Sequence, residues 1–424
     1  MIRFLLKGLL RDKNRSLLPI IVVSSGVILT VFMRTWLSGV LGDMVDFSAR
    51  YSTGHVKVMT RSYAENIDQI PNDLAYIGIS DLKDKLRTAY PDMNWTERIS
   101  FGGLLDAPDE NGETRSQGTV IGMAVNLFSE NSPEIDRLNI LKSIIDGTLP
   151  DEPGEILISH DLSEKLEIHP GDEVTLISST MFGSMAFYNF TISGTVRFGM
   201  VAMDKGAIIV DISDAQIALD MNDAAGEILG YFNTGIYDDL EAVEVCKQFN
   251  SNYRNEEDEF SPVMRSLREQ NELSSMLDYM DYAVGIVIFV FVFAMSLVLW
   301  NAGLLGGLRR YGEIGLRLAI GENKGHVYRS MISESVLIGI IGSFIGTIIG
   351  LSISYLLQKY GIDTGAYMKN TSLMIPTVLR AKITPDAYYI GFIPGLISTT
   401  LGTMLSGIGI YKRKTAQLFK ELEV

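Results

Sequence analysis

The stretch that decides the fold runs from Arg309 to Glu334 and reads RRYGEIGLRLAIGENKGHVYRSMISE. It separates two long apolar segments, and it carries five Arg or Lys residues against two Glu before its final residue. Ile314 and Leu318 are four residues apart, as on one face of a helix, and Glu313 and Arg317 form an i,i+4 pair. A short basic amphipathic helix between two membrane spans is suited to docking a cytoplasmic partner. The alternative interpretation is a positively charged loop that only fixes the membrane topology.

Four apolar runs on either side of this stretch predict transmembrane helices, because a bilayer is crossed by roughly 20 apolar residues. They are Ser16–Met33, Tyr282–Leu308, Ser335–Gln358 and Ala387–Tyr411. The first run is expected to continue past Arg34, whose side chain can reach the interface. We interpret it as an uncleaved helix and not as a signal peptide, because it exceeds the apolar length of such peptides and bulky residues follow it.

The distribution of charge predicts the orientation. The first sixteen residues, the central loop and the tail at Lys412-Arg413-Lys414 are all basic, so we place both termini in the cytoplasm. The segment from Leu41 to Tyr282 holds 17 Lys and Arg against 43 Asp and Glu, a net charge of −26, whereas the whole chain carries −15. A large acidic domain is therefore expected outside, in the periplasm of a bacterium. Its single cysteine, Cys246, excludes an intramolecular disulfide.

The predicted fold is an α-helical membrane protein with four transmembrane helices and a large extracytoplasmic α+β domain on helical stalks. Strands at His55–Met59, Trp95–Ser100 and Ile228–Tyr237 alternate with helices at Ile79–Tyr90 and Leu240–Tyr253. This order resembles a ferredoxin-like lobe with a β-rich insertion. In chain order we expect an amphipathic cytoplasmic helix (1–16), span one and a stalk (17–47), the periplasmic domain (48–260, insertion at 101–226), a helical stalk with span two (261–308), the cytoplasmic loop (309–330), span three (331–358), a periplasmic loop (359–386), span four (387–411) and a cytoplasmic tail (412–424).

Motifs for chemistry are missing from the sequence. No GxxxxGK[ST] loop for ATP occurs, no nucleophile elbow occurs, and the four His show no metal-ligand spacing, so we predict no catalytic, cofactor or metal site in this chain. Span three carries Gly342, Gly346 and Gly350, a ladder of small residues that lets helices pack closely, although glycine is also common in membrane helices. Glu334 at the start of that span either ties the loop to span three or reaches the interface.

Together these features resemble the FtsX-like/MacB-type permeases, the membrane subunits of ABC transporters that include the lipoprotein-releasing LolC and LolE. The basic loop before span three is the most specific part of the resemblance. Further similar segments lie in the insertion at Glu155–Ile158, Pro170–Val174 and Phe190–Val196. By this resemblance, the residues expected to couple to the ATPase are Arg310, Glu313, Ile314, Gly315, Leu316, Arg317, Leu318, Ala319, Gly321 and Glu334.

The resemblance also implies a mechanism, in which ATP-driven closure of a cytoplasmic ATPase dimer moves the stalks and the outside domain. ATP and Mg would be bound by that partner, which we expect to be a separate polypeptide because only sixteen residues precede span one. We expect Ile314 and Leu318 to enter a groove on the ATPase. Other expected partners are a second permease, identical or homologous, a lipoprotein or other amphiphilic cargo, a periplasmic carrier or adaptor, and membrane lipids, but no nucleic acid. Efflux of antibiotics or peptides is the alternative transport role. Regulation of a cell-wall hydrolase, with no transport, is a third, and the size of the outside domain argues against it.

Overall fold

The computed structural model describes residues 13–109, 111–129, 132–253, 258–270, 273–308, 311–363 and 378–408. The chain divides into two compact units, one made of residues 1–43, 279–362 and 379–424 and the other of residues 44–278 and 363–378. Most of the predicted amphipathic helix at 1–16 and the tail at 412–424 lie outside the described residues.

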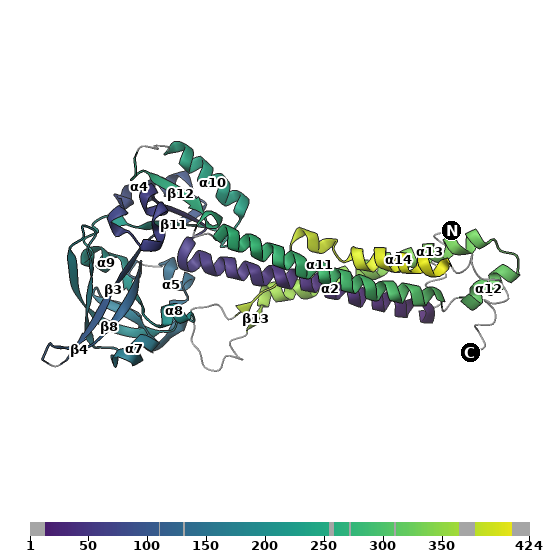
Figure 1. Ribbon diagram of the computed structural model, residues 1–424, viewed down its shortest axis with the longest axis horizontal. Coiled ribbons are helices and arrows are strands. Elements are labelled where there is room, and N and C mark those ends of the chain that lie inside the picture. The colour runs from purple at the N-terminus through teal and green to yellow at the C-terminus, as the bar shows by residue number, and fades with distance from the viewer. Residues whose placement is uncertain are drawn as a thin grey trace. The chain divides into compact units, whose positions relative to one another are not determined.

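Four helical segments within the described residues are long and apolar enough to cross a membrane. Three are continuous helices, α2 (Lys13–Ser48), α11 (Leu273–Leu308) and α13 (Lys324–Tyr360), which appear as the longest coiled ribbons in Figure 1. At 1.5 Å per residue the 36 residues of α2 extend about 54 Å, well beyond the roughly 30 Å of a hydrocarbon core. The first three predicted spans are thus helical, and α2 and α13 are longer than predicted.

The fourth segment is irregular. It consists of a 3-10 turn, η5 (Pro385–Tyr388), a π-helical turn, η6 (Ile393–Ser398), and helix α14 (Thr399–Gly407). Pro394 has no N–H, so the α-helical ladder is interrupted there, and the Thr399 hydroxyl donates to the carbonyl of Gly395 (2.5 Å). This is the kink that Pro394 and Gly395 predict.

The lobe of the second unit is a four-stranded antiparallel sheet in the order β12-β1-β11-β3. Along the chain the order is β1 (Val56–Thr60), α4 (Ile79–Ala89), β3 (Met93–Pro108), β11 (Glu227–Phe232), α10 (Asp239–Asn252) and β12 (Pro262–Ser266). Leu82, Leu86 and Phe249 of the two helices join the core formed by Val56, Trp95 and Ile228. Strands from both ends of the segment are therefore neighbours in one sheet.

The predicted helix from Ser261 is wrong at its start. Residues 262–266 form the edge strand β12, a 3-10 turn follows at η4 (Leu267–Glu269), and α11 begins at Leu273. Val263 and Leu267 have helical spacing, but within residues 262–266 the buried residues are Met264 and Ser266, which is the two-residue period of a strand. Pro262 suits the end of an edge strand, because it cannot donate a ladder hydrogen bond.

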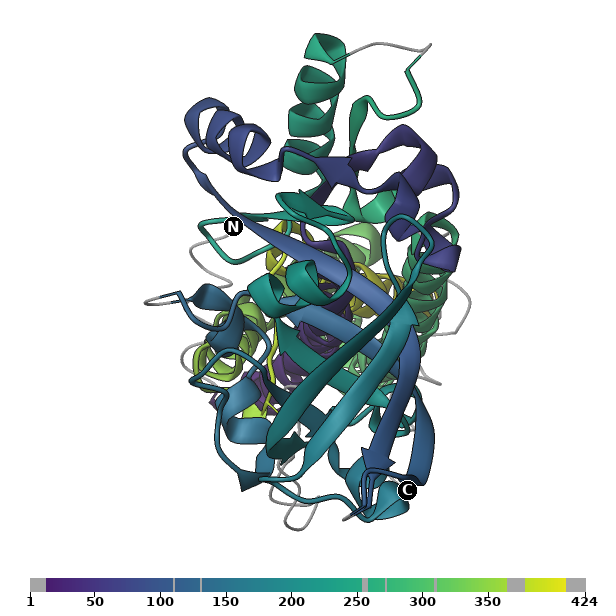
Figure 2. The ribbon, with the colours of Figure 1, turned by 90° about the vertical axis from the view of Figure 1, so that its left-hand side faces the viewer.

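The β-rich insertion closes into a six-stranded barrel, since β3 pairs with β4 and β7, and the path continues through β9, β6 and β8 back to β7. Its other strands are β4 (Thr114–Val125), β6 (Glu155–Ser159), β7 (Glu173–Ser179), β8 (Met185–Val196) and β9 (Ala207–Asp211), seen obliquely in Figure 2. Phe101, Leu105 and Phe190 are buried within it. Strand β3 belongs to both the lobe sheet and the barrel: residues 93–98 pair with β11 and residues 99–108 with β4.

The shorter elements connect these parts. They are η1 (Ala49–Thr53), α3 (Arg61–Glu65), η2 (Ile67–Gln69), η3 (Asn72–Leu74), β2 (Tyr76–Ile77), α5 (Pro133–Arg137), α6 (Ile140–Ser143), β5 (Ile144–Gly147), α7 (His160–Leu166), α8 (Val201–Asp204), α9 (Ile212–Ala218), β10 (Ala224–Ala225), β13 (Ile362–Asp363) and β14 (Val378–Leu379).

Candidate coupling loop, helix interface and ion-pair cluster

The loop between α11 and α13 contains helix α12, Tyr311–Ala319. Gly321 ends it with a positive φ of +95°. The Gly321 N–H donates to the Leu318 carbonyl and the Glu322 N–H to the Arg317 carbonyl, both at 3.1 Å. This is the glycine-dependent termination that the sequence predicts. Arg317 Nη2 also lies 3.3 Å from Glu313 Oε1, the predicted i,i+4 pair.

The apolar residues of α12 lie on two different faces. Ile314 is 5% exposed and packs with Val327 and Met331 of α13, and Leu318 packs against the same cluster. Within this chain the partner of Ile314 and Leu318 is thus the next helix, with Ile314 buried and Leu318 half-buried. Their entry into a groove on an ATPase stays a prediction. Leu316 and Ile320 are instead 54% and 79% exposed.

The other predicted loop residues take different positions. Gly315 is buried and Ala319 is exposed on α12, whereas Arg310 lies outside the described residues. Glu334 is half-buried on α13 and lies beyond the first turns of that helix in the sequence, after α12 has ended. Its role in tying the loop to span three stays a prediction.

The glycine ladder of α13 faces α2 of the same chain. A Cβ on Gly342 would lie 2.7 Å from Val23 Cγ1, and one on Gly346 would lie 2.7 Å from the Ser24 carbonyl oxygen. The Ser24 hydroxyl donates to the Gly342 carbonyl (3.1 Å), and a Cβ on Gly350 would also meet a side chain of α2 at 3.0 Å. Because this face is occupied within the chain, the ladder gives no reason to expect that two permeases pair through it.

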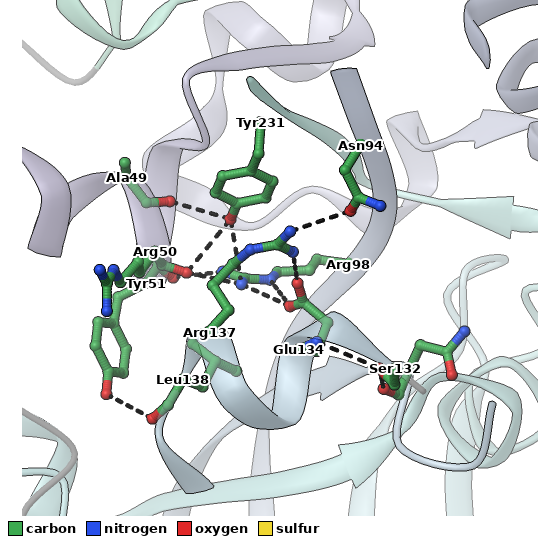
Figure 3. Close-up of polar contacts among 11 residues, drawn as sticks. Ala49, Arg50, Tyr51, Asn94, Arg98, Ser132, Glu134, Arg137, Leu138 and Tyr231 are labelled. Carbon is green, nitrogen blue, oxygen red and sulfur yellow. Dashed lines mark hydrogen bonds and ion pairs between the residues drawn. The ribbon is translucent and has the colours of Figure 1, made fainter. Parts of the chain in front are cut away.

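A buried cluster of charged side chains lies in the second unit, residues 44–278 and 363–378 (Figure 3). Arg98 of β3 and Glu134 of α5 form an ion pair, with Arg98 Nη2 2.7 Å and Nε 3.2 Å from the same carboxylate oxygen. The other oxygen of Glu134 accepts from Arg137. The guanidinium carbon of Arg137 lies 3.6 Å from the ring centroid of Tyr231. Both carboxylate oxygens are thus paired, as burial of the charge demands.

The same cluster holds the end of a helix. Arg98 donates to the carbonyl oxygens of Arg50 (2.7 Å) and Tyr51 (2.9 Å), and the Tyr231 hydroxyl donates to that of Ala49 (3.1 Å). Burial raises the pKa of Tyr231 to about 12, so its hydroxyl stays a donor. Burial, followed by the positive charges of Arg137 and Arg50, lowers the pKa of neighbouring His55 to about 4. This cluster was not predicted from the sequence. Its one local signal is the charged pair Glu97-Arg98 in β3, whose residues 93–105 are otherwise uncharged.

Comparison with known proteins finds relatives of both parts of the chain. Residues 285–415 match the FtsX-like permease C-terminal family. Over 250 residues the chain is 24% identical to the lipoprotein-releasing system transmembrane protein LolC of Xylella fastidiosa (strain Temecula1), covering 57% of this chain and 56% of the relative. These matches support an ABC permease of the FtsX/MacB/LolC type.

The match takes in about half the length of that LolC relative. The permease is also 25% identical over 138 residues to the ABC transporter permease YtrF of Bacillus subtilis (strain 168), covering 31% of this chain and 28% of YtrF. It is 34% identical over 67 residues to the macrolide export ATP-binding/permease protein MacB of Wolinella succinogenes, covering 16% and 10%. A similar solved structure is the periplasmic region of MacB from Actinobacillus actinomycetemcomitans, with a TM-score of 0.35, 12% identity, and coverage of 53% of this chain and 94% of that one.

Proposed function

We propose that this permease transmits ATP-driven motion from a cytoplasmic ATPase dimer to its extracytoplasmic domain, and so releases lipoproteins or other amphiphiles from the membrane. ATP and Mg would be bound by the ATPase, a separate subunit, and a second permease would complete the transporter. The lipoprotein-releasing role named for the LolC relative supports the cargo. The length of α2, beyond what a bilayer requires, supports a helix that carries motion outward.

The proposed setting is the inner membrane of a bacterium, with both termini in the cytoplasm and residues 44–278 in the periplasm. The charge of −26 on the long segment and the basic loop and termini support this orientation. We also propose that the lobe is ferredoxin-like and stands on helical stalks. The order β12-β1-β11-β3, with α4 and α10 as the two crossovers, supports the first part of that proposal.

The observation that carries the proposal is the division of α12 into an anchored face and an exposed face. Ile314 and Leu318 fix the helix on α13, and this leaves Leu316 and Ile320 exposed one helical turn apart. Two aliphatic side chains at this spacing suit a shallow apolar groove on a partner. Burying each would contribute roughly 1.5–3 kcal/mol to association.

Co-purification of the ATPase with tagged permease tests this docking face. We expect Leu316→Glu and Ile320→Glu each to remove the ATPase, because a carboxylate would be desolvated in an apolar groove. Leu316→Met keeps the apolar surface and serves as the matched control. Recovery of the ATPase at the wild-type level with both Glu variants would exclude this face.

Leu318→Glu separates docking from loop folding. The introduced carboxylate would lie against Val327 and Met331. We therefore expect this variant to lower the thermal stability of the membrane unit, residues 1–43, 279–362 and 379–424, as well as ATPase recovery. Leu316→Glu, on the exposed face, is expected to leave that stability unchanged. Equal stability of the two variants would contradict the assignment of the faces.

Export of antibiotics or peptides with an adaptor protein is the second candidate, and the name of the MacB relative supports it over a short segment. Depletion of the permease distinguishes the two roles. Mislocalised lipoproteins would support release, whereas normal lipoprotein sorting with increased drug sensitivity would support efflux. A defect in cell-wall hydrolysis alone would point to FtsX-like regulation.

A further inference from the structure

We infer that the Arg98–Glu134–Arg137 cluster is a clamp that fixes the outer end of α2 to the junction between the lobe and the barrel, so that all three move as one body. The inference concerns the extracytoplasmic unit alone. Its use in transmitting motion rests on the proposed function.

The helix enters the cluster without a break. Ser48, the last residue of α2, keeps helical dihedral angles (φ −56°, ψ −43°), and the chain continues as the π-helical turn η1, Ala49–Thr53. The carbonyl groups at a helix end have no partner within the helix and carry partial negative charge. Arg98 supplies that partner with a full positive charge, which makes its bonds to the carbonyls of Arg50 and Tyr51 stronger than neutral ones.

Arg98 stands at the point where one strand passes from the lobe into the barrel. It is paired with Glu227 at the end of β11, and the next residue, Ile99, is paired with Ala124 of β4. A contact at this position therefore reaches both substructures through a single strand.

A second connection runs to the barrel side through α5, which follows β4. Glu134 accepts from both Arg98 and Arg137, and the Tyr51 hydroxyl donates to the carbonyl of Leu138 at the end of α5 (3.1 Å). The helix end is thus bonded to β3, to β11 through Tyr231, and to α5 (Figure 3). With Glu134 fully buried and Arg98 2% exposed, water cannot replace these bonds without opening the cluster.

Hydrogen exchange of the intact permease in detergent tests the clamp. The variant Arg98→Met with Glu134→Gln removes one positive and one negative charge, keeps the side-chain volumes and leaves Arg137 an amide oxygen as acceptor. We expect amides in residues 49–54 to exchange about tenfold faster or more, because each lost charge-assisted bond is worth about that factor. Exchange in the barrel strands β6 and β9 should be unchanged.

Two further variants make the test decisive. Lys83→Met with Glu97→Gln removes another ion pair, in which Lys83 Nζ lies 2.5 Å from Glu97 Oε2 of β3, and it should leave residues 49–54 unchanged. Tyr231→Phe deletes only the hydroxyl that donates to Ala49, and we expect a smaller but local acceleration. Unchanged exchange at 49–54 in the folded double variant overturns the clamp. Should that variant not fold, unchanged exchange in Tyr231→Phe overturns it.

The role in transmission has its own readout. In the ATPase-bound permease in nanodiscs, we expect the double variant to hydrolyse ATP at the wild-type rate, while the ATP-dependent change in exchange of the barrel is lost. If the wild-type permease recruits no ATPase, the proposed function fails, but the exchange result at residues 49–54 still decides the clamp.

Discussion

Protonation of His55 should destabilise the unit that contains the lobe and the barrel in mild acid. His55 is 3% exposed, and its Nδ1 accepts a hydrogen bond from the N–H of Phe232 (3.0 Å). Burial, followed by the positive charges of Arg137 and Arg50, lowers the pKa of His55 from 6.5 to about 4. A proton on Nδ1 would also abolish the bond from Phe232. The unfolded chain therefore binds more protons than the folded one between these two values.

The sign and size of the effect follow directly. The stabilisation is complete above pH 6.5, declines as the pH falls, and is fully lost near pH 4. A difference of about 2.5 pKa units corresponds to about 3 kcal/mol in the free energy of unfolding. That is a large part of the stability of an ordinary domain.

Urea unfolding in detergent at pH 6.5, 5.5 and 4.5 measures it. Of the three Trp, Trp95 alone lies outside the membrane helices, and it is buried in the lobe core. A background of Trp36→Phe and Trp300→Phe makes its fluorescence specific for the lobe. His55→Asn keeps an acceptor for the Phe232 N–H but does not titrate, so the difference between the two proteins cancels the contribution of the carboxylates. The same dependence on pH in both proteins would refute the reasoning.

Three other outcomes are expected. Gly346→Leu should lower the free energy of unfolding of the unit that contains α2 and α13 by about 1–3 kcal/mol, because a Cβ at this position would lie 2.7 Å from the Ser24 carbonyl oxygen. Gly285→Leu on α11, where a Cβ meets nothing within 4 Å, should have little effect. Equal shifts in thermal unfolding of the two variants would contradict the packing. Burial raises the pKa of the Cys246 thiol to about 12, so maleimide at pH 7.5 should label it only after urea is added, and rapid labelling of the folded protein would show that the site is open. The ion pair between Arg34 and Asp386 should give a coupling energy of about 1 kcal/mol in a double-mutant cycle of Arg34→Gln and Asp386→Asn, and strictly additive effects would show that the pair is not formed.

The sequence predicts elements whose signal is local. Strand β1, Val56–Thr60, is shifted by one residue from the predicted strand His55–Met59, and the predicted helix at Ile79–Tyr90 differs from α4 by one residue. The membrane spans are predictable for the same reason, since the length of an apolar run and the charges around it suffice to predict a span. The irregular turn at Pro394-Gly395 is also predictable locally, because proline lacks the backbone N–H that a regular helix needs.

Features that depend on distant partners could not be predicted. Residues 262–266 become a strand because β1, some two hundred positions earlier, offers its free edge, and this outweighs a weak helical spacing. Which face of α12 is buried depends on where α13 begins, and the spacing of apolar residues within α12 gives no information about that. The bonds of Arg98 join three segments that are separate in the sequence, so no spacing rule connects them.

The position of β11 in the lobe sheet has a consequence for how the domain folds. This strand lies between β1 and β3, yet its residues, 227–232, follow the entire barrel in the chain. Since the chain is made from its N-terminal end, β1 and β3 have open edges until the barrel strands and β11 have followed. Open strand edges invite pairing with other chains, and contacts this far apart in sequence form slowly. Newly made protein is thus most exposed to aggregation and to proteases before β11 arrives, and a chaperone that covers strand edges should raise its yield.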